Sequence, residues 1–145
     1  MFKTILVPID PAEPEFANPA LEKAIRMSHD YGARLHLVAV RAYVQGYVTE
    51  FLPADYDEKA VEEASEQLAG IASRLEVPEG KLTSNVRSGA VYTEVMEEAE
   101  AIKADLIMLN SHRPGVATYF LGSNAANIVR HARCSVLVLR EEGDL

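Results

Sequence analysis

Short apolar runs bounded by turn residues recur along the chain. Most are rich in Val, Ile and Leu and stop at a polar or glycine-containing segment, which is typical of strands buried in a parallel sheet. The pattern predicts strands over Thr4 to Ile9, Leu35 to Val40, Lys81 to Arg87, Asp105 to Leu109 and Ser135 to Leu139.

Amphipathic segments separate these runs, with apolar residues three or four positions apart as on one face of a helix. We predict helices that end near Gly32 and that span Asp57 to Leu75, Tyr92 to Ile102 and Ser123 to His131. The first helix should bury Ala20, Leu21, Ala24, Ile25, Met27 and Ser28. The second should bury Val61, Ala64, Leu68, Ile71 and Leu75.

Strand and helix alternate from one end of the chain to the other. This alternation predicts an α/β fold in which right-handed crossovers build a five-stranded parallel sheet with helices on both faces. In such open sheets ligands bind at the carboxyl ends of the strands, where the strand order reverses. Asp10 follows the first strand, and Asn110, Ser111 and His112 follow the fourth.

A glycine turn, Gly122-Ser123-Asn124, opens the last helix. Glycine lets a ligand approach the backbone, and the free N–H groups and dipole of a helix N-terminus attract anions. The turn therefore predicts a phosphate cradle, although Ser and Asn also start ordinary helices. The guanidinium of Arg113, in the preceding turn, suits a phosphate clamp but could equally be a solvated loop side chain.

The bulk composition narrows the classes of protein to consider. A chain of 145 residues, 48% hydrophobic and 25% charged, predicts one soluble globular domain over residues 1–145. The net charge of −8 argues against a nucleic-acid surface. No apolar stretch is long enough to span a bilayer, so we expect no membrane partner. With the single Cys134 and no recognisable signal peptide, we expect a cytoplasmic protein.

The two ends of the chain carry the sequence motifs of a known family. The first is Thr4-Ile5-Leu6-Val7-Pro8-Ile9-Asp10; the second combines Gly122-Ser123 with Ile128-Val129-Arg130-His131-Ala132 and Cys134-Ser135-Val136-Leu137-Val138-Leu139. Together they resemble the universal stress protein family over the whole chain. The resemblance implies a Rossmann-like, adenine nucleotide alpha hydrolase-like fold with strand order 3-2-1-4-5. It also implies binding of ATP or another adenine nucleotide, with or without Mg²⁺.

One part of the family motif differs in this chain. Nucleotide-binding members carry Gly-x-x-Gly, nine residues and then Gly-Ser or Gly-Thr. Here Asn110 stands at the first glycine, Ser111 and His112 keep the following step, and Arg113 comes next, so the loop is one residue shorter. The chain resembles a subgroup with a Ser-His-Arg-Pro turn, which we expect still binds ATP.

The resemblance and the strand-end rule together nominate one set of nucleotide-binding residues. Gly122, Ser123 and Asn124 would hold phosphate, and His112 would contact phosphate or ribose. Asp10 would lie near adenine or ribose or help to hold Mg²⁺, its alternative being a turn or capping aspartate. The full set is Pro8, Ile9, Asp10, Val38, Val40, Asn110, Ser111, His112, Arg113, Gly122, Ser123 and Asn124.

The remaining candidate residues receive simpler interpretations. His29 and His36 have no ligand-spaced partner, so we do not expect a metal site there. The acidic stretches Glu94 to Glu100 and Asp57 to Glu66 are interpreted as solvated helix faces. A loop with Tyr43, Tyr47, Phe51 and Tyr56 would cover the nucleotide or pack at a subunit contact.

The last strand, Val136 to Leu139, is apolar and forms an edge of the expected sheet, which invites pairing. The family commonly dimerises there, so we predict a homodimer or a higher oligomer. The motifs supply binding but no base–nucleophile pair. We therefore predict a nucleotide-responsive stress regulator with at most slow ATP hydrolysis. The alternatives are a nucleotide-free interaction protein and, with little support, a nucleotidyl transferase or electron-transfer flavoprotein-like domain.

Overall fold

The computed structural model describes residues 1–42, 50–111 and 122–140. Within these ranges, five strands pair in parallel as one sheet in the order β3-β2-β1-β4-β5, which confirms the predicted fold class. The strands are β1 (Thr4–Ile9), β2 (Arg34–Arg41), β3 (Leu82–Ser88), β4 (Leu106–Asn110) and β5 (Ser135–Leu139). The described helices are η1 (Pro14–Ala17), α1 (Asn18–Tyr31), α3 (Tyr56–Ser73), α4 (Val91–Ala101) and α5 (Ser123–His131).

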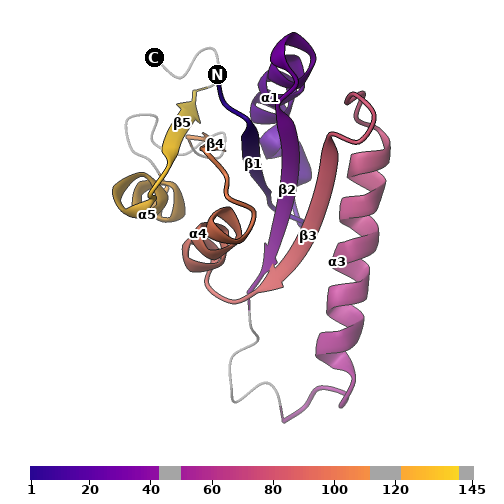
Figure 1. The fold of residues 1–145 in the computed structure, drawn as a ribbon. Helices are drawn as coiled ribbons and strands as arrows, with labels where there is room; N and C mark the ends of the chain where they lie inside the picture. The colour runs from indigo at the N-terminus through magenta and orange to yellow at the C-terminus, as the bar shows by residue number, and fades with distance from the viewer. Residues whose placement is uncertain (43–49, 112–121, 141–145) are drawn as a thin grey trace.

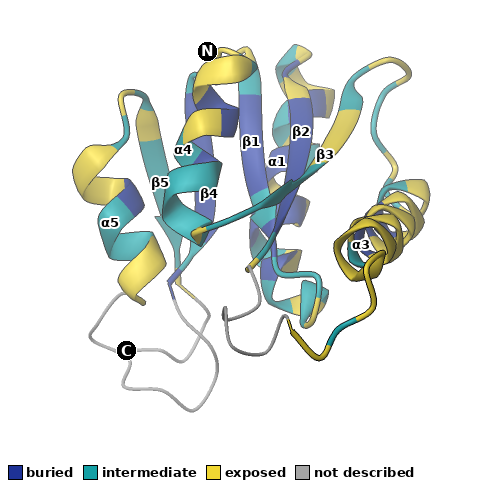
Figure 2. Cartoon of the chain, turned by 90° about the horizontal axis from the view of Figure 1, so that it is seen from below, coloured by how far each residue is buried: buried dark blue, intermediate teal, exposed yellow. Residues whose placement is uncertain are grey.

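Helices cover both faces of the sheet (Figure 1). On one face, α1 and α3 pack against a core that includes Ile5, Leu35 and Met108. On the other face, α4 and α5 pack against Leu6, Val38 and neighbouring side chains. The three inner strands β2, β1 and β4 are the most deeply buried, as Figure 2 shows, because helices lie on both sides of them.

The predicted helix faces agree with the structure except at one end of α3. In α1, Ala20, Leu21, Ala24 and Ser28 are buried, and the helix ends at Gly32 in the left-handed conformation, with φ of 77°. In α3, Ala64, Leu68 and Ile71 are buried.

Val61 was predicted to face inward in α3, and that prediction is wrong, since its relative exposure is 36%. No residue from Tyr56 to Glu63 is buried, so the first part of the helix stands off the sheet. Helical periodicity identifies a face correctly, but it does not show how far along the helix the sheet reaches.

The strand order reverses next to β1, which pairs with β2 on one side and with β4 on the other. Their carboxyl ends, and the polar residues that follow them, therefore lie together. The start of α5 is tied to the same edge, because the Gly122 N–H donates to the Ser111 carbonyl over 3.3 Å. In the part of the chain that the structure describes, no helix is both long and apolar enough to cross a bilayer.

Candidate nucleotide-binding site

A cavity of about 700 Å³ opens where the carboxyl ends of β1, β2 and β4 meet the start of α5. Every predicted site residue that the structure describes lines it: Pro8, Ile9, Asp10, Val38, Val40, Asn110, Ser111, Gly122, Ser123 and Asn124. The other two predicted residues, His112 and Arg113, lie outside the described residues. The fold thus gathers one set of residues from four separate segments of the chain.

One half of the cavity is apolar. Val38 and Val40 of β2 face Val91 and Val95 of α4, and Leu109 closes the same region. Apolar walls of this kind suit the faces of an aromatic base. The sequence analysis missed Val91 and Val95. Their spacing of four residues at the start of a helix was the available signal, but it equally fits a helix packed on the core.

The opposite half is formed by the N-terminus of α5. Gly122 is the N-cap, no described side chain caps the helix, and the first helical bond runs from the Ala126 N–H to the Gly122 carbonyl over 2.9 Å. The N–H groups of Ser123 and Asn124 therefore have no acceptor within the helix. Together with the helix dipole they make this end of the cavity attractive to an anion.

Gly122 leaves this end of the cavity open. A Cβ added at Gly122 would meet no other atom of the described chain within 4 Å. The space next to its backbone is therefore available to a ligand, and a larger side chain at this position would occupy it.

Ser111 connects the ends of β4 and β5 to the start of α5. It is 2% exposed, and its N–H donates to the Leu139 carbonyl of β5 over 2.9 Å. Its own carbonyl accepts from Gly122. Ser111 thus acts through its backbone in fixing the start of α5 against the ends of β4 and β5.

Asn110, which stands where the family motif has glycine, connects two walls of the cavity. Its side-chain amide donates to the Phe16 carbonyl of η1. Its Oδ1 is shielded from solvent and has no hydrogen-bond partner in the described chain. The side chain therefore holds the segment after β1 against the end of β4, a connection that glycine would not make.

Asp10 takes part in a turn as well as lining the cavity. Its carboxylate accepts from the Ala12 N–H over 2.9 Å, and its carbonyl accepts from the Glu13 N–H over 3.2 Å. The turn role considered from the sequence is therefore present in the structure. Among the described lining residues only Asp10 and Arg41 are charged, and Arg41 is paired with Asp57 over 2.8 Å.

A buried ionic cluster beside the cavity was not foreseen. Glu98 was predicted to lie on a solvated face of its helix, but it is only 3% exposed. Its Oε2 lies 2.8 Å from His36 Nε2, and its Oε1 accepts from Arg87 Nε over 3.0 Å and from Asn85 over 3.2 Å. The prediction failed because these partners come from β2 and β3, far from Glu98 in sequence.

The cluster keeps Glu98 ionised. Burial acts to raise the pKa of this carboxyl, but the hydrogen bonds from His36, Arg87 and Asn85 outweigh it, so the pKa lies below its ordinary value. The same contact with Glu98, with a further hydrogen bond to Glu94, raises the pKa of Arg87. Glu98 therefore accepts hydrogen bonds from all three neighbours, and α4 is held firmly against the sheet.

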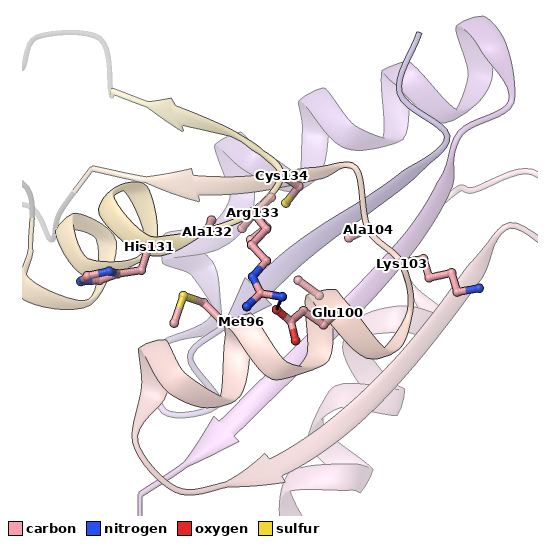
Figure 3. A pocket seen from close by; sticks show the side chains of 10 residues that line it. Met96, Glu100, Lys103, Ala104, His131, Ala132, Arg133 and Cys134 are labelled. Carbon is pink, nitrogen blue, oxygen red and sulfur yellow. Dashed lines mark ion pairs between the residues drawn. The ribbon is translucent and has the colours of Figure 1, made fainter.

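A second hollow, of about 260 Å³, lies between α4 and the segment that enters β5 (Figure 3). Arg133 and Glu100 reach toward each other across it and form an ion pair of 3.3 Å. Cys134 lies at its edge, and burial raises the pKa of the thiol, so the sulfur stays protonated and is a poor nucleophile. None of the predicted nucleotide-binding residues lines this hollow.

The aromatic loop is described only in part. Tyr43 and Tyr47 lie outside the described residues, Phe51 is 85% exposed, and Tyr56 begins α3 with 37% exposure. A covering or interface role for this loop stays a prediction. In the described ranges, no group of three or more His, Cys, Asp and Glu side chains is arranged to hold a metal ion.

Comparison with known proteins assigns the chain and its fold to one family. The model of the universal stress protein family matches residues 1–140. This chain belongs to the universal stress protein family. It is 34% identical over 143 residues to universal stress protein G of Escherichia coli O157:H7, covering 97% of this chain and 100% of that protein.

Solved structures of the family share the fold. The structure of hypothetical protein MJ0577 matches with a TM-score of 0.80 and 26% identity, covering 99% of each chain. A universal stress protein family member from Arabidopsis thaliana, solved with AMP bound, matches with a TM-score of 0.61 and 14% identity over 98% of this chain and 94% of that one. At that identity the second likeness concerns the fold alone.

Proposed function

We propose that this universal stress protein binds ATP in the 700 Å³ cavity and acts as a nucleotide-responsive regulator. The observation that carries the proposal is the convergence of all the described candidate residues on a cavity with an apolar half and an uncapped helix N-terminus. The cavity lies at the reversal of strand order, where open α/β sheets bind their ligands.

The two halves of the cavity suggest how the nucleotide lies. Adenine fits between Val38 and Val40 on one side and Val91 and Val95 on the other. The phosphates then meet the N–H groups at the start of α5 and the Ser123 hydroxyl. His112 and Arg113 are further proposed phosphate contacts from the adjoining loop.

Asp10 fits two roles beside the ribose. Its carboxylate can accept from a ribose hydroxyl or the adenine amine, and it supplies the hard oxygen that Mg²⁺ prefers beside phosphate oxygens. Mg²⁺ bound there would neutralise phosphate charge. We favour ATP over a monophosphate because α5 and the Arg113 guanidinium would offer donors to more than one phosphate. The AMP in the Arabidopsis thaliana family member supports the nucleotide class.

Fast turnover is not part of the proposal. The described cavity wall has a single carboxylate, Asp10, and no nucleophile hydrogen-bonded to a base. Phosphoryl transfer enzymes usually combine several charged groups with metal ions. We therefore propose at most slow hydrolysis and a role in which the bound nucleotide sets the state of the protein.

We also propose a homodimer formed through β5, in a single-domain cytoplasmic protein. β5 is an edge of the sheet, and Val136 to Leu139 are all half-buried in one protomer. Antiparallel pairing with a second copy would satisfy the outer backbone groups and cover these side chains. Higher oligomers could add to this dimer.

Mass spectrometry of the nucleotide released from freshly purified, denatured protein tests the proposal. ATP or another adenine nucleotide near one equivalent per chain is the expected result. Protein that carries no nucleotide and acquires none on incubation with ATP would favour a nucleotide-free interaction protein. Asn110 in place of the motif glycine is the feature that would then explain the loss.

A further inference from the structure

A third cavity, polar and of about 380 Å³, lies at the opposite end of the sheet from the proposed nucleotide cavity. Lys3 precedes β1, Arg34 begins β2 and Lys81 precedes β3, and all three line it together with Tyr31 at the end of α1. Backbone bonds from Arg34 N to Lys3 O, 2.8 Å, and from Leu35 N to Lys81 O, 2.7 Å, fix these strand starts side by side. Parallel pairing therefore gathers three cations at the amino ends of these strands.

The three cations meet in a chain whose net charge is −8. None of the three forms an ion pair with another residue of the described chain, whereas Arg41, Arg87 and Arg133 are each paired with a carboxylate. Lys3 and Arg34 are exposed and Lys81 is half-buried. Three cations without an ion pair in the described chain thus meet at one cavity of an acidic protein.

Tyr31 adds a second, independent sign of a ligand. Its hydroxyl oxygen is shielded from solvent and has no hydrogen-bond partner among the described residues. A buried hydroxyl in this state is unfavourable and is rare in folded proteins. Burial, followed by the charges of Asp105 and Asp30, raises the pKa of Tyr31, so the phenol keeps its proton and remains a donor.

The nearby acidic groups do not neutralise the cavity's cations directly. Asp105 accepts the backbone N–H groups of Lys3 and Thr4 over 2.8 and 2.9 Å, and it forms no ion pair with the three cations in the described chain. Asp30 is exposed near the end of α1. The carbonyl end of α1 attracts cations, which accounts for the positive side chains near it. It does not account for the Tyr31 hydroxyl, which has no hydrogen-bond partner among the described residues.

We propose that this cavity binds a phosphate-type oxyanion through Lys3, Arg34, Lys81 and the Tyr31 hydroxyl. The guanidinium fork of Arg34 can donate two parallel hydrogen bonds to such an anion. The lysines add charge, and the phenol donates a further bond once the side chains that shield its oxygen have moved aside. Because two of the cations are solvent-exposed, binding should weaken as salt screens them.

The site is separate from the proposed nucleotide site, since the two cavities share no lining residue. Its existence therefore does not depend on ATP binding, and one variant separates the two. The valine side chain in Gly122→Val would occupy the space beside the start of α5. Gly122 does not line the 380 Å³ cavity, so that cavity should be unchanged.

The test titrates inorganic pyrophosphate into the full chain at low salt and follows backbone amides by nitrogen–proton NMR. We expect saturable shifts at Gly32 and Arg34 that persist in Gly122→Val. The double variant Arg34→Gln, Lys81→Gln should weaken binding roughly tenfold or more, since two charged hydrogen bonds are lost. Lys23→Gln, which removes an exposed cation of α1 outside the cavity, is the matched control and should bind as before.

Tyr31→Phe removes only the hydroxyl. Because that group has no partner in the free protein, the variant should keep the thermal midpoint and lose pyrophosphate affinity several-fold. The proposal is overturned by non-saturable shifts, or by equal weakening in Lys23→Gln and the double variant. It is also overturned if the shifts lie only at residues 122–124 and vanish in Gly122→Val, because the anion then belongs to the nucleotide cavity.

Discussion

Glu98 of α4 accepts a hydrogen bond from the imidazole Nε2 of His36 in β2 over 2.8 Å, and both side chains are almost wholly shielded from water. The other ring nitrogen of His36 lies 2.6 Å from the Thr83 hydroxyl of β3. These contacts tie α4 to two strands at once. Since Val91 and Val95 of α4 line the 700 Å³ cavity, the cluster also fixes the position of one cavity wall.

Glu98→Gln should therefore destabilise the fold. The amide keeps the shape of the side chain but cannot accept from His36, Arg87 and Asn85 together, and we expect a loss of about 1–3 kcal/mol in the free energy of unfolding. Urea denaturation at neutral pH measures it. Glu97, whose side chain is 59% exposed, supplies the control, because Glu97→Gln should change stability much less.

The same variant carries a pH signature. The pKa of Glu98 in the folded protein is lowered from its ordinary 4.5, so its stabilising effect is complete above that value and disappears as pH falls through the folded pKa. The wild-type protein should lose stability below about pH 4.5 more steeply than Glu98→Gln. If the free energy of unfolding falls equally steeply with decreasing pH in both proteins, Glu98 is not the source of the acid sensitivity.

Gly122→Val should abolish nucleotide binding, because its side chain would stand in the space beside the first N–H groups of α5. The backbone at Gly122 does not require glycine, so the fold should survive. Gly70→Val makes the same substitution at an exposed position of α3 away from the cavity. It is the control for the general effect of replacing a glycine by a β-branched residue. Unchanged ATP affinity in Gly122→Val would show that phosphate does not bind at the start of α5.

Val91→Phe tests the apolar half of the cavity. The larger ring should occupy the space assigned to adenine and weaken the binding of both ATP and adenosine at least tenfold. Equilibrium dialysis with the two ligands measures the effect. Val129→Phe on the exposed side of α5 serves as a comparison. If adenosine binds both variants equally well, the base lies elsewhere.

Val138→Asp tests the proposed dimer. A carboxylate on the edge strand would be buried without a partner in the paired sheet, so light scattering coupled to gel filtration should show a dimer for the wild type and a monomer for the variant. Removing all residues after Cys134 should also abolish the dimer. A dimer that persists in Val138→Asp would place the interface elsewhere, such as the aromatic loop.

The parallel sheet and the location of the site follow from local patterns in the sequence, whereas the strand order came from the family resemblance. Apolar runs and turn residues mark the strand ends, and parallel connections bring Asp10, Asn110 and Gly122 to one edge. The errors arise where partners come from distant segments. Glu98 resembles its solvated neighbours until β2 and β3 supply donors, and Val61 fits the buried face of α3 until the sheet ends short of it.

The most direct test of nucleotide binding is calorimetric titration of ATP into nucleotide-free protein, with and without Mg²⁺, beside Gly122→Val. We predict saturable micromolar binding at one site per chain in the wild type and none in the variant. Absence of binding heat at several temperatures, in protein that is folded and carries no nucleotide after purification, would contradict the account.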